Sequence, residues 1–140
     1  MERTKTAWIA FALAVLGLGI SGYLTWYSFI TRTGVCTLTG YFGCSAVLTS
    51  AYSRIGGVPV ALLGFVWFLV VASTSMLVVR DGKWLKYLLA WSVLGLLGIV
   101  GLEYVEIFVI RSICLECTSA HLLGIAVLVL TLSIWLGRRA

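Results

Sequence analysis

Four cysteines offer the clearest chemistry in this sequence. Cys36 and Cys44 are separated by seven residues in a stretch that lies between two apolar runs, and Cys114 and Cys117 form the C-x-x-C motif C-L-E-C at the start of a later apolar run. An even number of cysteines indicates disulfide chemistry wherever they meet oxidising conditions.

Three kinds of site are compatible with these cysteines. Static disulfides are the first, but closing the short C-x-x-C loop restricts little chain entropy, so this motif is a poor staple. Zinc is the second; four thiolates suffice in number, but the Cys36–Cys44 spacing is not that of a zinc knuckle, and we expect no metal. The third, thiol–disulfide exchange, is favoured because a helix N-terminus stabilises the reactive thiolate.

The amino-acid composition predicts that membrane-spanning helices position these cysteines. Of 140 residues, 61% are hydrophobic and 11% charged, with a mean hydropathy of +1.10, which excludes an ordinary soluble domain. A helix crosses a bilayer with about 20 apolar residues. Four apolar runs of that length predict helices at about residues 6–30, 58–79, 84–110 and 113–135, and hence an all-α, four-transmembrane-helix bundle. Isolated basic residues do not predict nucleic-acid binding.

The charge distribution predicts how this bundle is oriented. Four spans place both termini on the same side, and basic residues favour the cytoplasm. Seven basic residues fall on the side of the termini and three on the other: Arg3, Lys5, Arg80, Lys83, Lys86, Arg138 and Arg139 against Arg32, Arg54 and Arg111. We therefore expect a multi-pass protein of the cell membrane with cytoplasmic termini and all four cysteines near the outer face.

A thiol relay in a membrane needs an electron acceptor, and a lipid-soluble quinone reaches a C-x-x-C at the bilayer edge without a further domain. His121 lies four residues after Cys117 and seven after Cys114, so the three share one helix face. Its imidazole could hydrogen-bond a quinone carbonyl or move a proton. The alternative is a histidine satisfied by a neighbouring helix residue.

Carboxylates near the same end allow another interpretation. Glu103 and Glu106 are three residues apart in the outer third of the third run, as in small proton-coupled transporters. The simpler expectation is that they reach interfacial water or pair with Arg111. Glu116, inside the C-L-E-C motif, is expected only to tune the neighbouring thiols by its charge.

Three stretches resemble the vitamin K epoxide reductase family, including its prokaryotic disulfide-forming members. They are Cys36-x7-Cys44, the segment 44–64 and the segment 104–121, and together the resemblance covers essentially the whole chain. Its specific features are the loop cysteine spacing, Ser50 six residues after Cys44, the G-x-P start of the second helix and the C-x-x-C of the last one.

The resemblance implies a role for each cysteine. Cys36 would exchange with a separate thioredoxin-fold partner, Cys44 would pass the exchange to Cys114, and Cys117 would face a quinone such as menaquinone or ubiquinone. Residues 45–53 would form a short amphipathic helix in the first outer loop, capping the quinone pocket. The implied quinone-binding positions are Val47, Leu48, Ser50, Leu63, Trp67, Leu102 and His121.

The expected protein is a single membrane domain over residues 1–140, without a fused thioredoxin-like domain, that passes electrons from partner thiols to a quinone and drives extracytoplasmic disulfide formation. One alternative is reduction of a quinone or its epoxide. Against it, Val60 and His121 stand where the animal enzymes have Asn and Tyr. The alternative of another class is a small proton-coupled transporter with structural cysteines.

Overall fold

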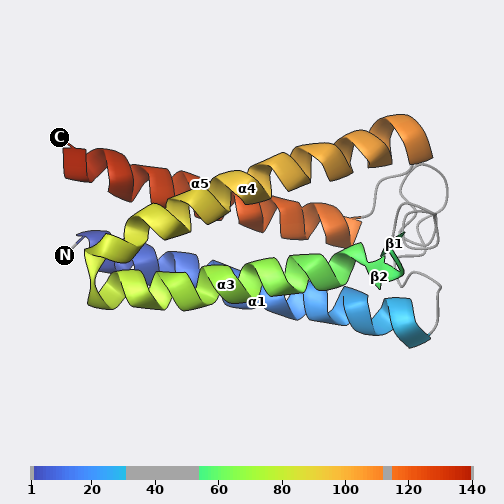
Figure 1. The fold of residues 1–140 in the computed structure, drawn as a ribbon, viewed down its shortest axis with the longest axis horizontal. Helices are drawn as coiled ribbons and strands as arrows, with labels where there is room; N and C mark the ends of the chain where they lie inside the picture. Colours follow the sequence, from blue (N-terminus) through green and yellow to red (C-terminus); the bar gives the residue numbers. More distant parts are fainter. Residues whose placement is uncertain (1, 31–53, 112–114, 140) are drawn as a thin grey trace.

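The protein is a bundle of four long helices (Figure 1), described in a computed structural model over residues 2–30, 54–111 and 115–139. In chain order the elements are α1 (Glu2–Ile30), β1 (Arg54–Ile55), β2 (Val58–Pro59), α3 (Val60–Arg80), the 3-10 helix η2 (Gly82–Trp84), α4 (Leu85–Tyr104), the π-helix η3 (Val105–Ile110) and α5 (Leu115–Arg139). The predicted all-α, four-helix class is confirmed. The predicted short helix at 45–53 lies outside the described residues.

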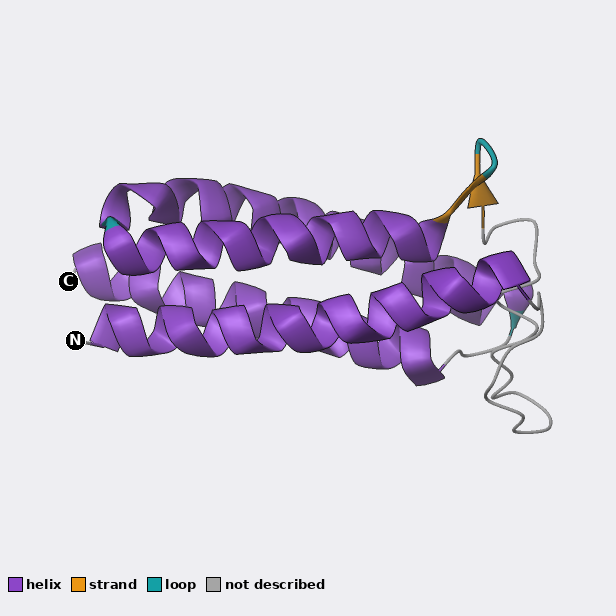
Figure 2. Cartoon of the chain, turned by 90° about the horizontal axis from the view of Figure 1, so that it is seen from below, coloured by secondary structure: helices purple, strands orange, loops and turns teal. Residues whose placement is uncertain are grey.

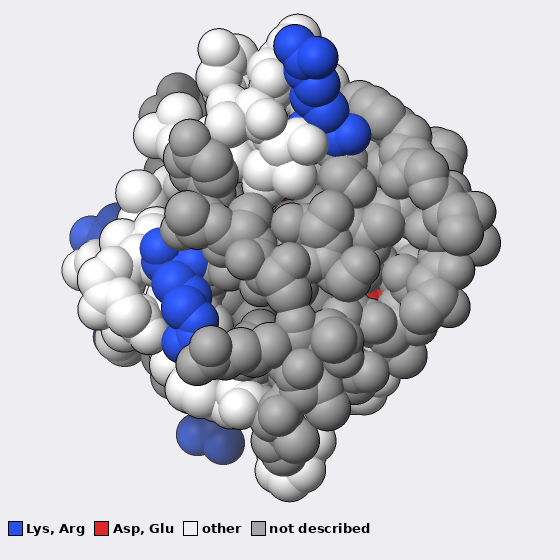
Figure 3. Space-filling view, turned by 90° about the vertical axis from the view of Figure 1, so that its right-hand side faces the viewer, with Lys and Arg blue, Asp and Glu red and all other residues white. Residues whose placement is uncertain are grey.

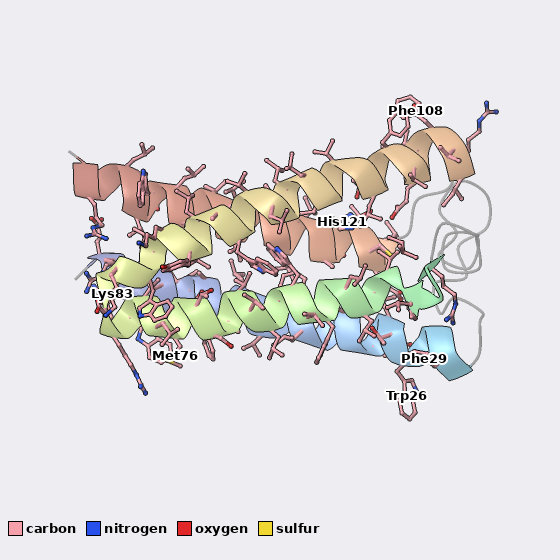
Figure 4. All side chains as sticks on the ribbon, viewed as in Figure 1. Trp26, Phe29, Met76, Lys83, Phe108 and His121 are labelled. Carbon is pink, nitrogen blue, oxygen red and sulfur yellow. The ribbon has the colours of Figure 1, made fainter. Side chains whose placement is uncertain are left out.

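The four helices are built to face lipid. Each is long and apolar enough to cross a membrane, over Glu2–Trp26, Val60–Arg80, Gly82–Ile110 and Leu115–Arg138. Large apolar side chains cover the outside of the bundle; Trp26, Phe29 and Phe108 are each at least 60% exposed and point away from it (Figure 4). Such a surface is stable only where lipid replaces water, so this is a multi-pass membrane protein.

Both chain termini lie at one end of the bundle, together with the turn between α3 and α4 (Figures 1 and 2). We call this the terminal end. The opposite end carries the β1–β2 hairpin and the start of α5, and we call it the cysteine end because Cys117 lies there. Figure 3 looks onto the cysteine end, where much of the visible face belongs to residues outside the described set.

Glycines and small residues let the helices approach closely. The most extensive packing is between α1 and α3, and a Cβ at Gly17 of α1 would overlap the ring of Phe68 on α3. Between α3 and α4, the indole N–H groups of Trp67 and Trp91 each donate to the other residue's carbonyl oxygen, at 3.0 and 3.1 Å. Close backbone approach is how helices associate in lipid, where hydrophobic burial drives little.

The hairpin before α3 differs from the sequence prediction. Val58 and Pro59 pair with Ile55 and Arg54 across a two-residue turn in which Gly56 and Gly57 have φ of 59° and 86°. Turns of this kind require positive φ at both central positions, which glycine adopts without strain. The second helix therefore begins at Val60 rather than at Val58, and Pro59 is its extended N-cap rather than a residue of its first turn.

The turn between α3 and α4 is closed by Asp81. Its carboxylate accepts the backbone N–H of Lys83 at 3.0 Å and pairs with the Lys83 ammonium at 3.0 Å. These hydrogen bonds hold the pKa of the Asp81 carboxyl below its usual value. The connection between the second and third long helices is thus a 3-10 turn capped by Asp81.

The sequence predicts one continuous helix at about residues 84–110, but the structure is not α-helical over the whole of this range. After Tyr104 the backbone continues as the π-helix η3 to Ile110, and Arg111 then takes a left-handed conformation with φ of 58°. A π-helix widens the turn and changes the direction in which side chains project; such segments occur frequently at functional sites. Glu106 lies in η3 and is buried, with 4% of its surface exposed.

Candidate active site

Cys117 lies in the first turn of α5, which begins at Leu115 in the described part of the chain. It is partly buried, at the cysteine end of the bundle. Two polar atoms beside it, Glu116 Oε2 and Thr118 Oγ1, are buried and have no hydrogen-bond partner among the described residues. A buried polar atom without a partner is costly, so these two atoms are available to a polar molecule that binds near Cys117.

His121 lies one helical turn after Cys117 and faces α4. Its Nδ1 forms a 2.5 Å hydrogen bond with the carboxylate of Glu103, and both side chains are largely shielded. Figure 4 shows His121 between α4 and α5. Because α4 and α5 pack against one another, the carboxylate and the imidazole meet within the bundle, inside the predicted spans.

Glu106 completes a group of three titratable side chains. One ligand atom from each of Glu103, Glu106 and His121 lies within 4.8 Å of the other two. Glu106 comes from η3, so the π-helical segment contributes directly to this group. Of these three titratable side chains, His121 lies one helical turn after Cys117. We call Glu103, Glu106 and His121 the titratable cluster.

The prediction of what Glu103 and Glu106 contact was wrong. The sequence had favoured interfacial water or Arg111, but Glu103 pairs with His121, and Glu106 is buried away from water. Arg111 is exposed and follows η3 with a left-handed backbone, which ends the helix that carries both carboxylates. The alternative for His121, a histidine satisfied by a neighbouring helix residue, agrees with its hydrogen bond to Glu103 of α4, and its role toward a quinone stays a prediction.

The distance between His121 and Glu103 fits a direct hydrogen bond better than it fits two ligands of one metal ion. Two ligands of a tetrahedral zinc ion, each about 2.0–2.1 Å from the metal, are separated by more than 3 Å. The 2.5 Å distance between His121 Nδ1 and Glu103 Oε1 is that of a direct hydrogen bond instead.

Three of the predicted quinone-binding positions besides His121 lie in the described part of the chain. Trp67 packs its ring against the backbone of Gly95 on α4 and lies close to Gly124, three residues after His121 on α5. Its N–H is engaged by the carbonyl of Trp91, so Trp67 can offer an apolar ring but no donor. Leu102, next to Glu103, is partly buried, whereas Leu63, one turn before Trp67, is 47% exposed.

The other predicted site residues lie outside the described residues: Cys36, Cys44, Val47, Leu48, Ser50 and Cys114. Conversely, the sequence did not single out Trp91, which fixes the Trp67 ring. Its signal in the sequence is weak, because a tryptophan in the middle of a membrane span is more often a lipid contact.

A comparison with protein-family models identifies the family of this chain. Residues 8–132 match the family described as the Vitamin K epoxide reductase family, and this range includes α3 and α4 and most of α1 and α5. Members of this family are membrane oxidoreductases that work on thiols, disulfides and quinones. The chain belongs to the vitamin K epoxide reductase family.

Proposed function

We propose that this chain oxidises the thiols of a separate thioredoxin-fold protein, transfers the electrons to a membrane quinone and so drives disulfide formation outside the cytoplasm. The family and the four cysteines support the proposal. In this scheme Cys36 exchanges with the partner, Cys44 passes the exchange to Cys114, and Cys117 is the cysteine next to the quinone.

The proposed reaction balances as a two-electron transfer. The partner's dithiol loses two electrons and two protons and becomes a disulfide. Each exchange step breaks one S–S bond as another forms, through a mixed disulfide, so the electron pair moves inward from cysteine pair to cysteine pair. When bound, the quinone supplies the oxidant that accepts the two electrons and two protons. The Cys114–Cys117 disulfide is thereby restored.

The observation that carries the proposal is the bond between His121 and Glu103. It supports the proposal because the His121 imidazole lies on the same face of α5 as Cys117, one helical turn later. The nearby Trp67 ring and Leu102 are apolar, as a flat lipid-soluble molecule requires, and the orphaned Thr118 hydroxyl is a further donor. The described residues thus fit a quinone: His121 would orient it, and Glu103 and Glu106 would return the proton that His121 gives up.

The proposed orientation has both termini in the cytoplasm and the cysteine end at the outer face of the cell membrane. Support comes from the terminal end, which carries Arg3, Lys5, Arg80, Lys83, Lys86 and Arg138 among its described residues. Basic residues at the ends of spans are retained in the cytoplasm.

The direct test is quinone reduction by the purified protein in detergent. The protein is reduced, freed of reductant and mixed anaerobically with a water-soluble quinone while absorbance is recorded. We expect rapid loss of one quinone per oxidisable cysteine pair in the wild type and none above background in Cys117→Ala. Ser119→Ala, two residues away on the exposed side of α5, is the matched control and should behave as the wild type. A Cys117→Ala protein that still reduces quinone would exclude the proposed terminal role of Cys117.

One observation favours a second candidate function. Three titratable side chains inside membrane spans are also what a proton-coupled transporter would use. Such a transporter would keep its activity in Cys117→Ala and lose it in Glu106→Gln, measured as proton-driven uptake into proteoliposomes. Quinone reduction in the same preparation would be absent.

A further inference from the structure

The terminal end, far from the cysteines, contains a cavity of about 390 Å³. Its lining side chains are Lys83 and Lys86, from η2 and the first turn of α4, and Trp135 and Arg138, near the end of α5. Figure 4 labels Lys83, which lies at the terminal end of the bundle. Three cationic groups and one indole face this space, and none of its described lining residues is a carboxylate.

A second cavity, of about 330 Å³, adjoins the first through their common lining residue Arg138, and Arg3 and Glu2 also line it. Arg138 Nη1 donates to the carbonyl oxygen of Gly82 at 2.8 Å. A Cβ at Gly82 would lie 2.5 Å from Arg3 Nη1 and 3.4 Å from Arg138 Nη1, so both guanidinium groups approach this one glycine. The Nε of Arg3 is buried and has no hydrogen-bond partner among the described residues.

The positive charge here exceeds the negative charge. At the terminal end, six basic residues have described side chains, whereas the acidic residues with described side chains there are Glu2 and Asp81. Asp81 is already paired with Lys83. Lys86 lies over the ring of Tyr87, with 5.0 Å from Nζ to the ring centre, and pairs with no carboxylate among the described residues. Converging guanidinium and ammonium groups with so few counter-ions favour a bound anion.

The position of the cavity identifies the kind of anion. It lies beside the ends of two candidate membrane spans, and Trp135, one of its lining residues, is of a type that is enriched at membrane interfaces. In the same turns α5 exposes Leu132 and Leu136, against which acyl chains can lie. Basic pockets between spanning helices are known to hold acidic headgroups. We propose that Lys83, Lys86 and Arg138 bind the phosphate of an anionic phospholipid.

The test measures lipid binding by the whole protein in a neutral detergent. Phosphatidylglycerol or phosphatidylcholine is titrated in, and bound lipid is counted by native mass spectrometry. We expect the wild type to retain phosphatidylglycerol preferentially. Since each basic group near the surface contributes about fivefold to such binding, Lys86→Gln should lower the affinity about fivefold and Lys83→Gln/Lys86→Gln about 25-fold. Lys86→Arg should retain it.

Arg111→Gln is the matched control, because it removes one exposed positive charge at the cysteine end and should leave the affinity unchanged. An equal loss in Arg111→Gln, or equal retention of the two lipids by the wild type, would overturn the proposal. A third arm adds inorganic phosphate at millimolar concentration. If phosphate displaces phosphatidylglycerol completely and itself binds as tightly, the ligand is a free phosphate and the lipid proposal is wrong. Thermal unfolding of each variant checks that it is folded.

Discussion

His121 of α5 and Glu103 of α4 are joined by a 2.5 Å hydrogen bond inside the membrane-spanning part of the bundle, one turn from Cys117. Neither residue can be replaced by an apolar one without leaving the other unpaired in a poorly solvated environment. The bond is therefore one polar contact that favours this rotation of α5 relative to α4. It also places the imidazole that we propose to act on the quinone.

Glu103→Gln tests the proposed proton transfer. The amide can still accept a hydrogen bond from His121, but it cannot take up a proton, so quinone reduction by the pre-reduced protein should fall about a hundredfold. Stopped-flow absorbance gives the rate. Tyr104→Phe, on the neighbouring and 60% exposed residue, should keep the wild-type rate. A Glu103→Gln rate equal to that of the wild type would remove Glu103 from the proton path.

Trp91→Phe tests the reciprocal bonds between α3 and α4. Loss of the Trp91 indole N–H leaves the Trp67 carbonyl without this donor and should cost about 1 kcal/mol of unfolding free energy. The measurement is unfolding in mixed micelles of increasing dodecyl sulfate content. Trp26→Phe makes the same chemical change on a side chain that is 66% exposed and should have little effect. Equal effects of the two substitutions would contradict a special role for the Trp67–Trp91 pair.

Gly95→Ala tests the close packing of the Trp67 ring. A Cβ at this position would overlap the indole, so the ring or the helix must move, at a cost of about 1–3 kcal/mol. Gly98→Ala, three residues later on α4, meets nothing within 4 Å and should instead stabilise the helix slightly. Unfolding in the same mixed micelles compares the two. If Gly95→Ala were as stable as Gly98→Ala, the described position of Trp67 would be wrong.

Asp81→Asn tests the capped turn at the terminal end through its pH dependence. The folded-state pKa of Asp81 lies below its ordinary value of 3.8, because the carboxylate accepts hydrogen bonds from Lys83. Its charge therefore stabilises the folded protein at pH values above about 4, and this advantage is lost as the pH falls through the folded-state pKa.

The expected result is that the wild type melts at a higher temperature than Asp81→Asn at neutral pH and that the two curves converge in acid. Differential scanning fluorimetry from pH 3 to pH 7 measures this. Arg80→Gln, which changes the charge next to the turn without removing a partner of Asp81, should show no such convergence. A constant difference between the wild type and Asp81→Asn at all pH values would contradict a charge effect.

Much of the architecture could be predicted from the sequence because the bilayer imposes it. About 20 apolar residues are needed for each span, so four long apolar runs predict four helices with the termini at one end. The sequence predicted two helix ends incorrectly. A run of apolar residues does not distinguish a π-helix from an α-helix over Val105–Ile110. Because Val58–Pro59 pairs with Arg54–Ile55, the second helix begins two residues later than predicted.

Within the candidate site, the sequence alone determined that Cys117 and His121 share one face of the last helix. A separation of four residues does this in any α-helix, whatever surrounds it. Only the tertiary structure decided that this face meets Glu103 and that Trp67 is held by Trp91. Such contacts depend on the rotation and crossing of helices relative to one another. Packing along their whole length fixes that rotation, and no local spacing encodes it.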